Sequence, residues 1–250
     1  DNNNNYIKKI RHLIHHSLKN KFDFCLKLDN DIIINNYILD FMYENINLLE
    51  NKKNLFMTPI LSSGSPTCDT FIDNFFDISE KKNIHNIFKN TKIPKNLWGF
   101  NYNFLNKYTI HSENWEYKNY SNALKNINYH YKGIHPIRIN DKAAEYLKKI
   151  ILKNKNKVFE KQNYRINITN DFVYFCNSIF LIKPSIYNEI INDNSLYVDI
   201  FDEVPVNKFS KKNNLNGIFI ENSFSIHPYY NSITNHLKKE EDLFKKIFNY

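Results

Sequence analysis

The sequence predicts an α/β protein in which helices flank a mixed, mostly parallel sheet, and three observations support this fold class. Strand-like apolar runs alternate with helical patterns along the chain, which is typical of α/β folds. The 250 residues are 42% hydrophobic and 16% aromatic, which is enough apolar surface for a substantial core. The sequence shows no internal repeat and no clear linker, so we expect residues 1–250 to form one domain.

The individual elements follow from the spacing of apolar residues. Intervals of three and four predict helices, and continuous or alternating apolar runs predict strands. Helices are expected over residues 6–20, from Asn35-Asn36 onward, over 71–90, over 141–153 with Asp141 as the cap, over 184–191 and over 233–249. Strands are expected over residues 22–28, 56–61, 172–182 and 218–226, and residues 95–135 are aromatic and irregular.

Charge and cysteine content narrow the range of functions. The net charge of +8 permits attraction to phosphates, but the lysines occur in isolated pairs, so we expect no nucleic-acid partner. Cys25, Cys68 and Cys176 lie far apart and are odd in number, which favours buried thiols in a reducing compartment. No apolar run reaches the length of a membrane span. We therefore expect a cytoplasmic protein without a transmembrane segment, and leave peripheral contact with a membrane open.

Two aspartates directly after the strand expected over residues 22–28 are the strongest chemical signal. Asp29 and Asp31 are two residues apart, and alternate residues of an extended chain point to one side. Paired carboxylates suit Mg²⁺ or Mn²⁺, and such an ion in turn suits a diphosphate. The alternative interpretation is a charged turn, because Asp and Asn are common turn residues.

Two later segments also carry candidate residues. Asp202 and Glu203 lie among apolar neighbours in residues 198–207, and burial raises the pKa of a carboxyl group toward the range of a general base. The alternative is an ordinary solvated loop. His227 follows the strand expected over 218–226, and ligands of open α/β sheets bind at the carboxyl ends of strands. A lone histidine is nevertheless more often structural.

The order of these segments resembles a known family. The run FDFCLKLDND followed by IIINNYIL resembles the metal-binding core of the GT-A glycosyltransferases, a superfamily of nucleotide-diphospho-sugar transferases. Farther along, CNSIFLIKPSIY is similar to its acceptor-side strand and helix, DIFDEVPVN to its acidic segment, and IHPYYN to its late metal-binding histidine. The resemblance covers residues 6–231. A GT-A domain opens with a strand that binds the nucleotide base, and we expect that strand to be missing from this chain.

The resemblance implies roles for individual residues. Asp31 would be a direct ligand of Mn²⁺ or Mg²⁺, Asp29 would contact the ribose or the metal through water, and His227 would be a further ligand. Asp202, with Glu203 as the alternate, would deprotonate the acceptor hydroxyl in an inverting reaction. The implied partners are a nucleotide-sugar donor and a glycan, lipid-linked or protein acceptor.

Two further residues and two other functions complete the sequence-based hypotheses. Lys27 either contributes charge near the phosphates or only packs its aliphatic stem. His16, or its neighbour His15, precedes the aspartate strand and could touch the nucleotide. A non-catalytic module that binds glycans or nucleic acid on the same fold is the main alternative function. A metal-dependent nuclease is a weaker one, since it also uses clustered carboxylates.

Overall fold

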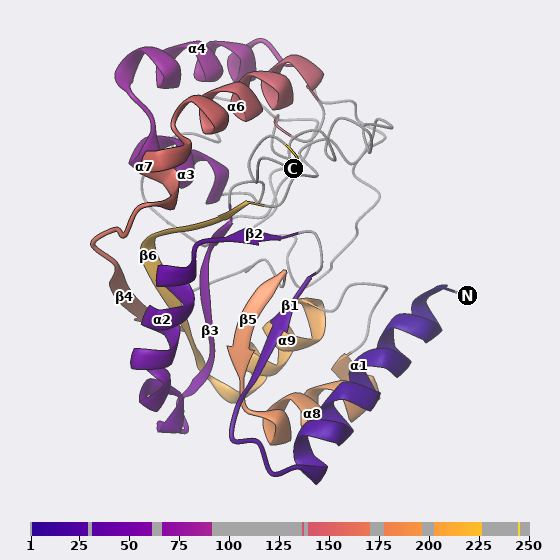
Figure 1. Ribbon diagram of the computed structural model, residues 1–250. Helices are drawn as coiled ribbons and strands as arrows, with labels where there is room; N and C mark the ends of the chain where they lie inside the picture. The colour runs from indigo at the N-terminus through magenta and orange to yellow at the C-terminus, as the bar shows by residue number, and fades with distance from the viewer. Residues whose placement is uncertain are drawn as a thin grey trace. The chain divides into compact units, whose positions relative to one another are not determined.

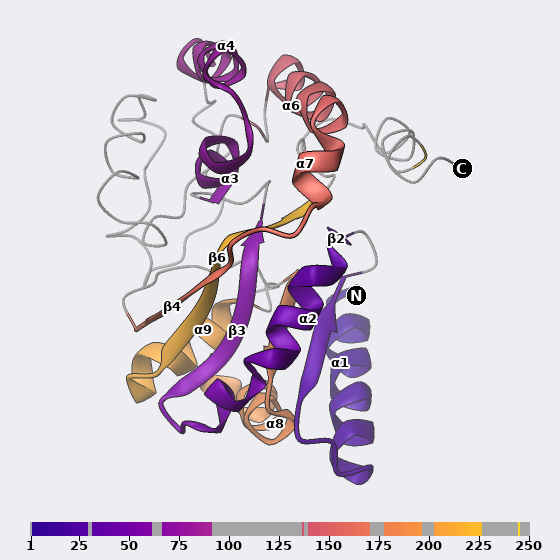
Figure 2. The same cartoon turned by 60° about the vertical axis from the view of Figure 1, so that its left-hand side comes forward.

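The structure is a computed structural model that describes residues 2–29, 32–61, 67–91, 137, 140–170, 178–196, 203–226 and 245 (Figures 1 and 2). The chain divides into two compact units, and neither is one continuous stretch of sequence. Unit 1 comprises Asp1–Asn30, Ile38–Pro59 and Tyr164–Ser223, and unit 2 comprises Asp31–Tyr37, Ile60–Asn163 and Phe224–Tyr250.

Most of the sheet belongs to unit 1, and two of its strands extend into unit 2. The elements of unit 1 are α1 (Asn2–Lys19), β1 (Cys25–Leu28), α2 (Asn36–Glu44), the 3₁₀ helix η1 (Ile46–Glu50), β3 (Asn54–Leu61), β4 (Arg165–Thr169), β5 (Ile179–Ile182), α8 (Pro184–Asn192), the 3₁₀ helix η6 (Asn194–Leu196), α9 (Glu203–Asn213) and β6 (Asn216–Ile226). Unit 2 also includes the last residues of β3 and β6 and the first residues of α2. The other elements of unit 2 are β2 (Ile33–Ile34), α3 (Thr67–Phe75), α4 (Ile78–Lys89), α6 (Asp141–Lys153) and α7 (Lys155–Phe159).

The six strands have the order β1-β5-β3-β6-β2, with β4 also paired to β6. β5 is antiparallel to both of its neighbours, β1 and β3, so β1 and β3 run in the same direction. β6 runs in that direction too, because Asn216 at its start donates to the carbonyl of Lys53 and Ser225 near its end donates to the carbonyl of Ile60. β2 and β4 are antiparallel to β6.

The expected α/β class is confirmed, whereas the expectation of a mostly parallel sheet is wrong. The sheet is mixed, and its pairs β1–β5, β3–β5, β2–β6 and β4–β6 are all antiparallel. β1, α2 and β3 do form a strand–helix–strand unit whose strands run the same way, as the alternation predicts. β5, however, returns from much later in the chain and lies between those two strands.

Unit 1 buries its apolar residues on both faces of the sheet. All four residues of β5 are buried, and this run is covered on both sides. Figures 1 and 2 show α2 on one face and α8 with α9 on the other. α2 buries Ile38 and Met42, and α8 buries Tyr187, Ile190 and Ile191. Burying each such side chain stabilises the fold by about 1.5–3 kcal/mol.

One glycine of the sheet is required by close packing. A Cβ atom at Gly217 would lie 2.7 Å from Cζ of Phe56 and 2.9 Å from Cε2 of Phe219. The two rings pack edge to face with their centroids 5.9 Å apart, and both are buried. A larger residue at position 217 would therefore force two core rings to move.

The structure confirms the strands expected at 56–61 and 218–226, with small shifts of their ends. It also confirms the helices expected at 6–20, from Asn35-Asn36 onward, at 141–153 and at 184–191. The strand expected over 22–28 is shorter and forms β1; the last part of the strand expected over 172–182 forms β5, and residues 171–177 lie outside the described residues. Asn140, not Asp141, caps α6, because its side chain accepts from the N–H groups of Lys142 and Ala143. The expected helix over 233–249, apart from residue 245, and the stretch 95–135 lie outside the described residues.

Residues 71–90 form parts of two helices, not the single helix expected. α3 ends at Phe75 and α4 begins at Ile78, because Asp77 starts a new helix with a capping box. The Asp77 carboxylate accepts from the N–H of Glu80 at 2.8 Å, and Glu80 Oε2 accepts from the N–H of Asp77 at 3.2 Å. The spacing Asp-x-x-Glu is a known helix-start pattern that the apolar periodicity concealed.

Unit 2 is built around a cluster of aromatic rings. Phe71 and Phe75 of α3 contact Phe224 of β6, with centroid distances of 5.7 and 5.0 Å. Phe159, at the end of α7, packs against the same ring at 5.6 Å. Ile33 of β2 belongs to this core as well. The short strand β2 is thus held in unit 2 by buried apolar contact as well as by its two-residue pairing with β6.

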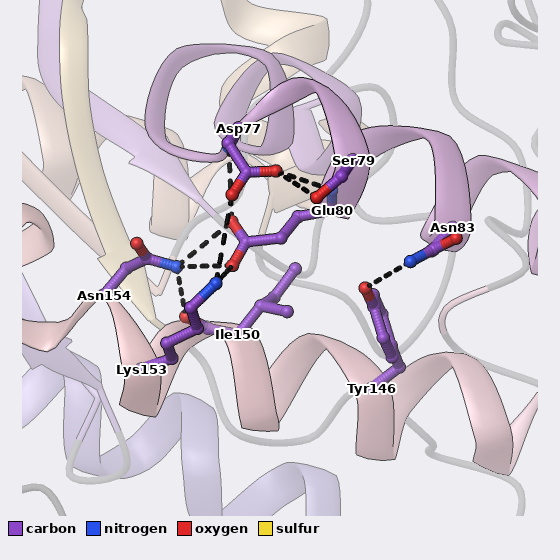
Figure 3. A network of polar contacts seen from close by, with 8 residues as sticks. All are labelled: Asp77, Ser79, Glu80, Asn83, Tyr146, Ile150, Lys153 and Asn154. Carbon is purple, nitrogen blue, oxygen red and sulfur yellow. Dashed lines mark hydrogen bonds and ion pairs between the residues drawn. The ribbon is translucent and has the colours of Figure 1, made fainter.

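A buried carboxylate links α4 to α6 in unit 2 (Figure 3). The Glu80 side chain is 5% exposed and accepts from Lys153 Nζ at 2.8 Å and from Asn154 Nδ2 at 3.2 Å. The same carboxylate closes the capping box with Asp77. Hydrogen bonds from the N–H of Glu80 and from the Ser79 hydroxyl lower the pKa of Asp77 below its ordinary value. One buried group therefore fixes the start of α4 against the end of α6.

Candidate functional site

The candidate site begins with β1, whose alternating side chains point to two sides. Cys25 and Lys27 are half-buried on one side, whereas Leu26 and Leu28 on the other side are 40% and 47% exposed. Asp29 continues the alternation beyond the strand, so it follows the side of Cys25 and Lys27. The expected arrangement of an apolar strand that delivers a carboxylate to its end is present.

The backbone of Asp29 is anchored to the neighbouring strand. Its N–H donates to the carbonyl of Ser178 at 2.9 Å, one step beyond the pairing of Leu28 with Ile179. The Thr58 hydroxyl donates to the carbonyl of Ile179 at 2.7 Å. One edge of the sheet in unit 1 is therefore formed by the end of β1, the start of β5 and the last part of β3 in that unit. The carboxyl end of a sheet is where α/β proteins bind their ligands.

Lys27 holds the carboxylate of Asp29. Its Nζ lies 2.6 Å from Asp29 Oδ1, and the two side chains are 11% and 29% exposed. An ammonium group at this distance compensates the charge of the carboxylate and fixes its position. The ion pair therefore orients the Asp29 carboxylate at the end of β1. Neither of the two roles expected for Lys27, charge near the phosphates or packing of its aliphatic stem, included this ion pair.

We expect this ion pair to contribute measurably to stability. In a double-mutant cycle of Lys27→Met and Asp29→Asn, the coupling free energy should be about 1 kcal/mol, at the upper end for partly exposed pairs. Urea unfolding of the wild type, the two single variants and the double variant measures this coupling. Strictly additive effects of the two substitutions would show that the contact does not stabilise the fold.

Asp31 and His227 lie outside the described residues, but each is within two residues of a strand, and these two strands pair with each other. Ile33 pairs with Ile226 and Ile34 pairs with Ser225 in the antiparallel β2–β6 ladder of unit 2. Asp31 precedes Ile33 by two residues, and His227 directly follows Ile226. The ladder thus joins two chain segments nearly two hundred residues apart, and each segment carries one of the expected metal ligands.

Asp202 also lies outside the described residues, whereas Glu203 is the first residue of α9. Val204-Pro205-Val206 is a β-branched and proline-containing run that favours an extended path, but it belongs to the first part of α9. Proline is tolerated in the first turn of a helix, where its missing N–H has no intrahelical partner. Pro205 and Val206 are both buried within this first part of α9. The helix packs against α8 and η6 in unit 1.

His16 is not brought to Asp29. It belongs to the last turn of α1 and is exposed. Its Nε2 atom lies 3.2 Å from the side-chain amide nitrogen of Asn20. The chain leaves α1 and enters β1 at Cys25, whereas Asp29 follows the other end of that strand (Figure 1). His16 and Asp29 therefore lie toward opposite ends of β1, and a nucleotide contact of His16 stays a sequence-based prediction.

Within the described ranges, no group of three or more His, Cys, Asp or Glu side chains is arranged to hold a metal ion. The expected ligands Asp31 and His227 and the expected base Asp202 are outside those ranges. The carboxylates expected from the sequence suit Mn²⁺ or Mg²⁺, whereas an imidazole ligand favours a transition ion such as Mn²⁺ over Mg²⁺. Of the carboxylates expected at the metal, Asp29 is the one that the structure describes, and it is paired with Lys27.

Cys25, on the same side of β1 as Lys27 and Asp29, is not suited to nucleophilic chemistry. Burial raises the pKa of its thiol to about 11, and the Sγ atom donates a hydrogen bond to the carbonyl of Ile182 at 3.4 Å. A protonated thiol is a poor nucleophile and a poor metal ligand. The sequence-based interpretation of Cys25 as a structural thiol agrees with this environment.

Two residues at the site were missed by sequence reasoning. Ser178 supplies the carbonyl that anchors Asp29, and Thr58 ties β3 to the start of β5. In both contacts the acceptor is a backbone carbonyl, that of Ser178 just before β5 or that of Ile179 in β5. Every residue type can supply such a carbonyl. No sequence signal could have identified Ser178, whereas a threonine inside the apolar run 56–61 was a visible exception to the pattern.

Comparisons of the chain with protein-family models, with curated proteins and with solved structures give no match. Within the described part of the chain, no helix has both the length and the apolar character needed to cross a bilayer.

Proposed function

We propose that this protein is a metal-dependent glycosyltransferase, which moves a sugar from a nucleotide-diphosphate donor to an acceptor hydroxyl. The observation that carries the proposal is the β2–β6 ladder, in which Ile33 pairs with Ile226. Asp31 and His227 flank this ladder in sequence, and an Asp and a His on adjoining chain segments are a suitable pair of ligands for Mn²⁺. The anchored carboxylate of Asp29 at the end of β1 supports the same interpretation.

The residues have distinct roles in the proposed reaction. Asp31 and His227 hold the divalent ion, and Asp29, oriented by Lys27, binds the donor ribose or a water of the ion. When bound, the ion neutralises charge on the departing diphosphate. Asp202, with Glu203 as the alternate, accepts the proton of the acceptor hydroxyl as that oxygen attacks the sugar. The acceptor is a glycan, a lipid-linked glycan or a protein.

Thermal unfolding in the presence of Mn²⁺ and a panel of sugar nucleotides tests this proposal. A ligand that binds only the native state stabilises it by about 2.7 kcal/mol at a hundredfold excess over its Kd. We expect one nucleotide sugar to raise Tm when Mn²⁺ is present, and neither ligand to do so fully alone. Stabilisation by a glycan without metal or nucleotide would instead support a non-catalytic binding module.

The Asp31→Asn variant makes the test specific. The substitution conserves shape but removes a charged oxygen ligand, so we expect it to abolish the Mn²⁺-dependent nucleotide shift and to leave Tm of the free protein nearly unchanged. Asp23→Asn is the matched control, because Asp23 is exposed and precedes β1. A calorimetric titration that shows the same Mn²⁺ dependence in Asp31→Asn and wild type would disprove the metal role of Asp31.

A further inference from the structure

The outward side of α1 is strongly basic. From Ile7 to Phe22 the chain has no acidic residue. Its exposed cationic and imidazole side chains are Lys8, Lys9, Arg11, His12, His15, His16, Lys19 and Lys21. The first carboxylate that follows is Asp23, and α8, the helix packed against α1, contributes only Glu189. Five permanent positive charges thus stand against Asp23, Glu189 and Asp193, the C-cap of α8, and Asp193 is already paired with Lys212.

The orientation of α1 is fixed by its buried side. Ile10 and Ile14 are buried, 9% and 2% exposed, on the side that packs against α8. Arg11 Nη2 donates to the carbonyl of Ile191 at the end of α8 at 3.2 Å. Figures 1 and 2 both show α1 beside α8 at the outside of unit 1. The basic side is therefore held facing outward and cannot turn inward without breaking this packing.

Large apolar side chains lie among these charges. Leu13 is 64% exposed, Leu18 is 37% exposed and Phe22, just after the helix, is 56% exposed. Residues three and four apart are neighbours on a helix surface, so Lys9 and His16 flank Leu13. Exposing large apolar groups to water is unfavourable unless a partner covers them. A surface that combines lysines with leucine and phenylalanine suits a partner with anionic groups above an apolar layer.

We propose that the outward side of α1 binds the surface of an anionic lipid bilayer. Acidic headgroups attract the lysines, and Leu13 and Phe22, the most exposed of the three apolar side chains, enter the boundary between headgroups and acyl chains, whereas Leu18 lies one turn from the buried Ile14. Nucleic acid would use the same positive charges, but it is bound mainly through phosphates and gives exposed leucines no apolar partner. The contact is peripheral, because the buried Ile10 and Ile14 stay packed on α8. It does not depend on the proposed transfer reaction.

Co-sedimentation of the whole chain with lipid vesicles tests this inference. We expect binding to vesicles of phosphatidylcholine mixed with phosphatidylserine, little binding to phosphatidylcholine alone, and release at high salt. Because each lysine near an anionic surface contributes about fivefold in affinity, Lys8→Gln combined with Lys9→Gln should weaken binding by roughly 25-fold. Leu13→Gln should weaken it as well, with a smaller effect on its salt dependence.

Matched variants elsewhere in the chain control for general effects of charge and apolarity. Lys52→Gln with Lys53→Gln removes an exposed lysine pair between η1 and β3, and Ile78→Gln removes an 85% exposed apolar side chain at the start of α4. These variants should bind vesicles as the wild type does. Equal losses in control and α1 variants, equal binding to neutral vesicles, or binding to homopolymeric RNA without binding to anionic vesicles would each overturn the inference.

Discussion

Replacing Asp202 by Asn is expected to slow sugar transfer by about 10²–10⁴-fold while the affinity for the sugar nucleotide stays nearly the same, because a general base acts on the acceptor and not on donor binding. Single-turnover transfer assays at saturating donor measure the rate. Calorimetry with Mn²⁺ and donor measures the affinity. The amide conserves the shape of the carboxyl group, so the loss reports on the missing proton acceptor.

Glu203→Gln is the matched comparison for this experiment. Glu203 is the first residue of α9, whereas Asp202 precedes the helix. We expect Glu203→Gln to slow transfer much less than Asp202→Asn. If Glu203→Gln is the inactive variant, the two residues exchange roles. If neither variant slows transfer, the segment is structural, and a retaining mechanism without a protein base becomes the better explanation.

Replacing Glu80 by Ala is expected to lower the free energy of unfolding by about 2–3 kcal/mol, because several hydrogen bonds to one charged group are lost together with the capping box of α4. The variant removes the partner of Lys153 and Asn154 and opens the capping box of α4 (Figure 3). Urea unfolding followed by far-UV circular dichroism measures the change.

Two further variants separate the contributions of Glu80. Glu80→Gln keeps its shape and an oxygen acceptor, so we expect it to cost less than Glu80→Ala. Lys153→Met should cost less than Glu80→Ala, because the Glu80 carboxylate loses its charged partner but keeps its hydrogen bonds from Asn154 and from the N–H of Asp77. If Lys153→Met were as destabilising as Glu80→Ala, the ion pair itself, and not the burial of the carboxylate, would be the stabilising feature.

The fold could be predicted where the local pattern determines the element. The spacing of Ile10, Ile14 and Leu18 was enough to find α1, and the apolar run from Phe56 to Leu61 was enough to find β3. The order of the strands depends on contacts between distant segments. Nothing in the run from Ile179 to Ile182 indicates that it inserts between β1 and β3. The start of α4 could not be predicted from the spacing of apolar residues. It depends on the capping box of Asp77 and Glu80, which are polar.

The candidate site could be predicted only as a set of residue types at strand ends. That Asp29 follows a strand was readable from the sequence, because alternation and strand length are local properties. Its ion pair with Lys27 was not, since two residues of opposite charge at this spacing also occur in solvated turns. The pairing of Ile33 with Ile226 could not be predicted either, because β2 has only two residues and leaves no recognisable pattern.

The position of β1 at one end of the strand order has a consequence for behaviour at high protein concentration. A terminal strand with exposed leucines can accept a strand from another molecule and start aggregation. In β1 the two exposed leucines are separated by Lys27, whose charge points inward to Asp29. An added strand would remove this ion pair from water, which is unfavourable. Lys27, the side chain that orients the carboxylate of Asp29, therefore also disfavours the addition of a further strand to β1.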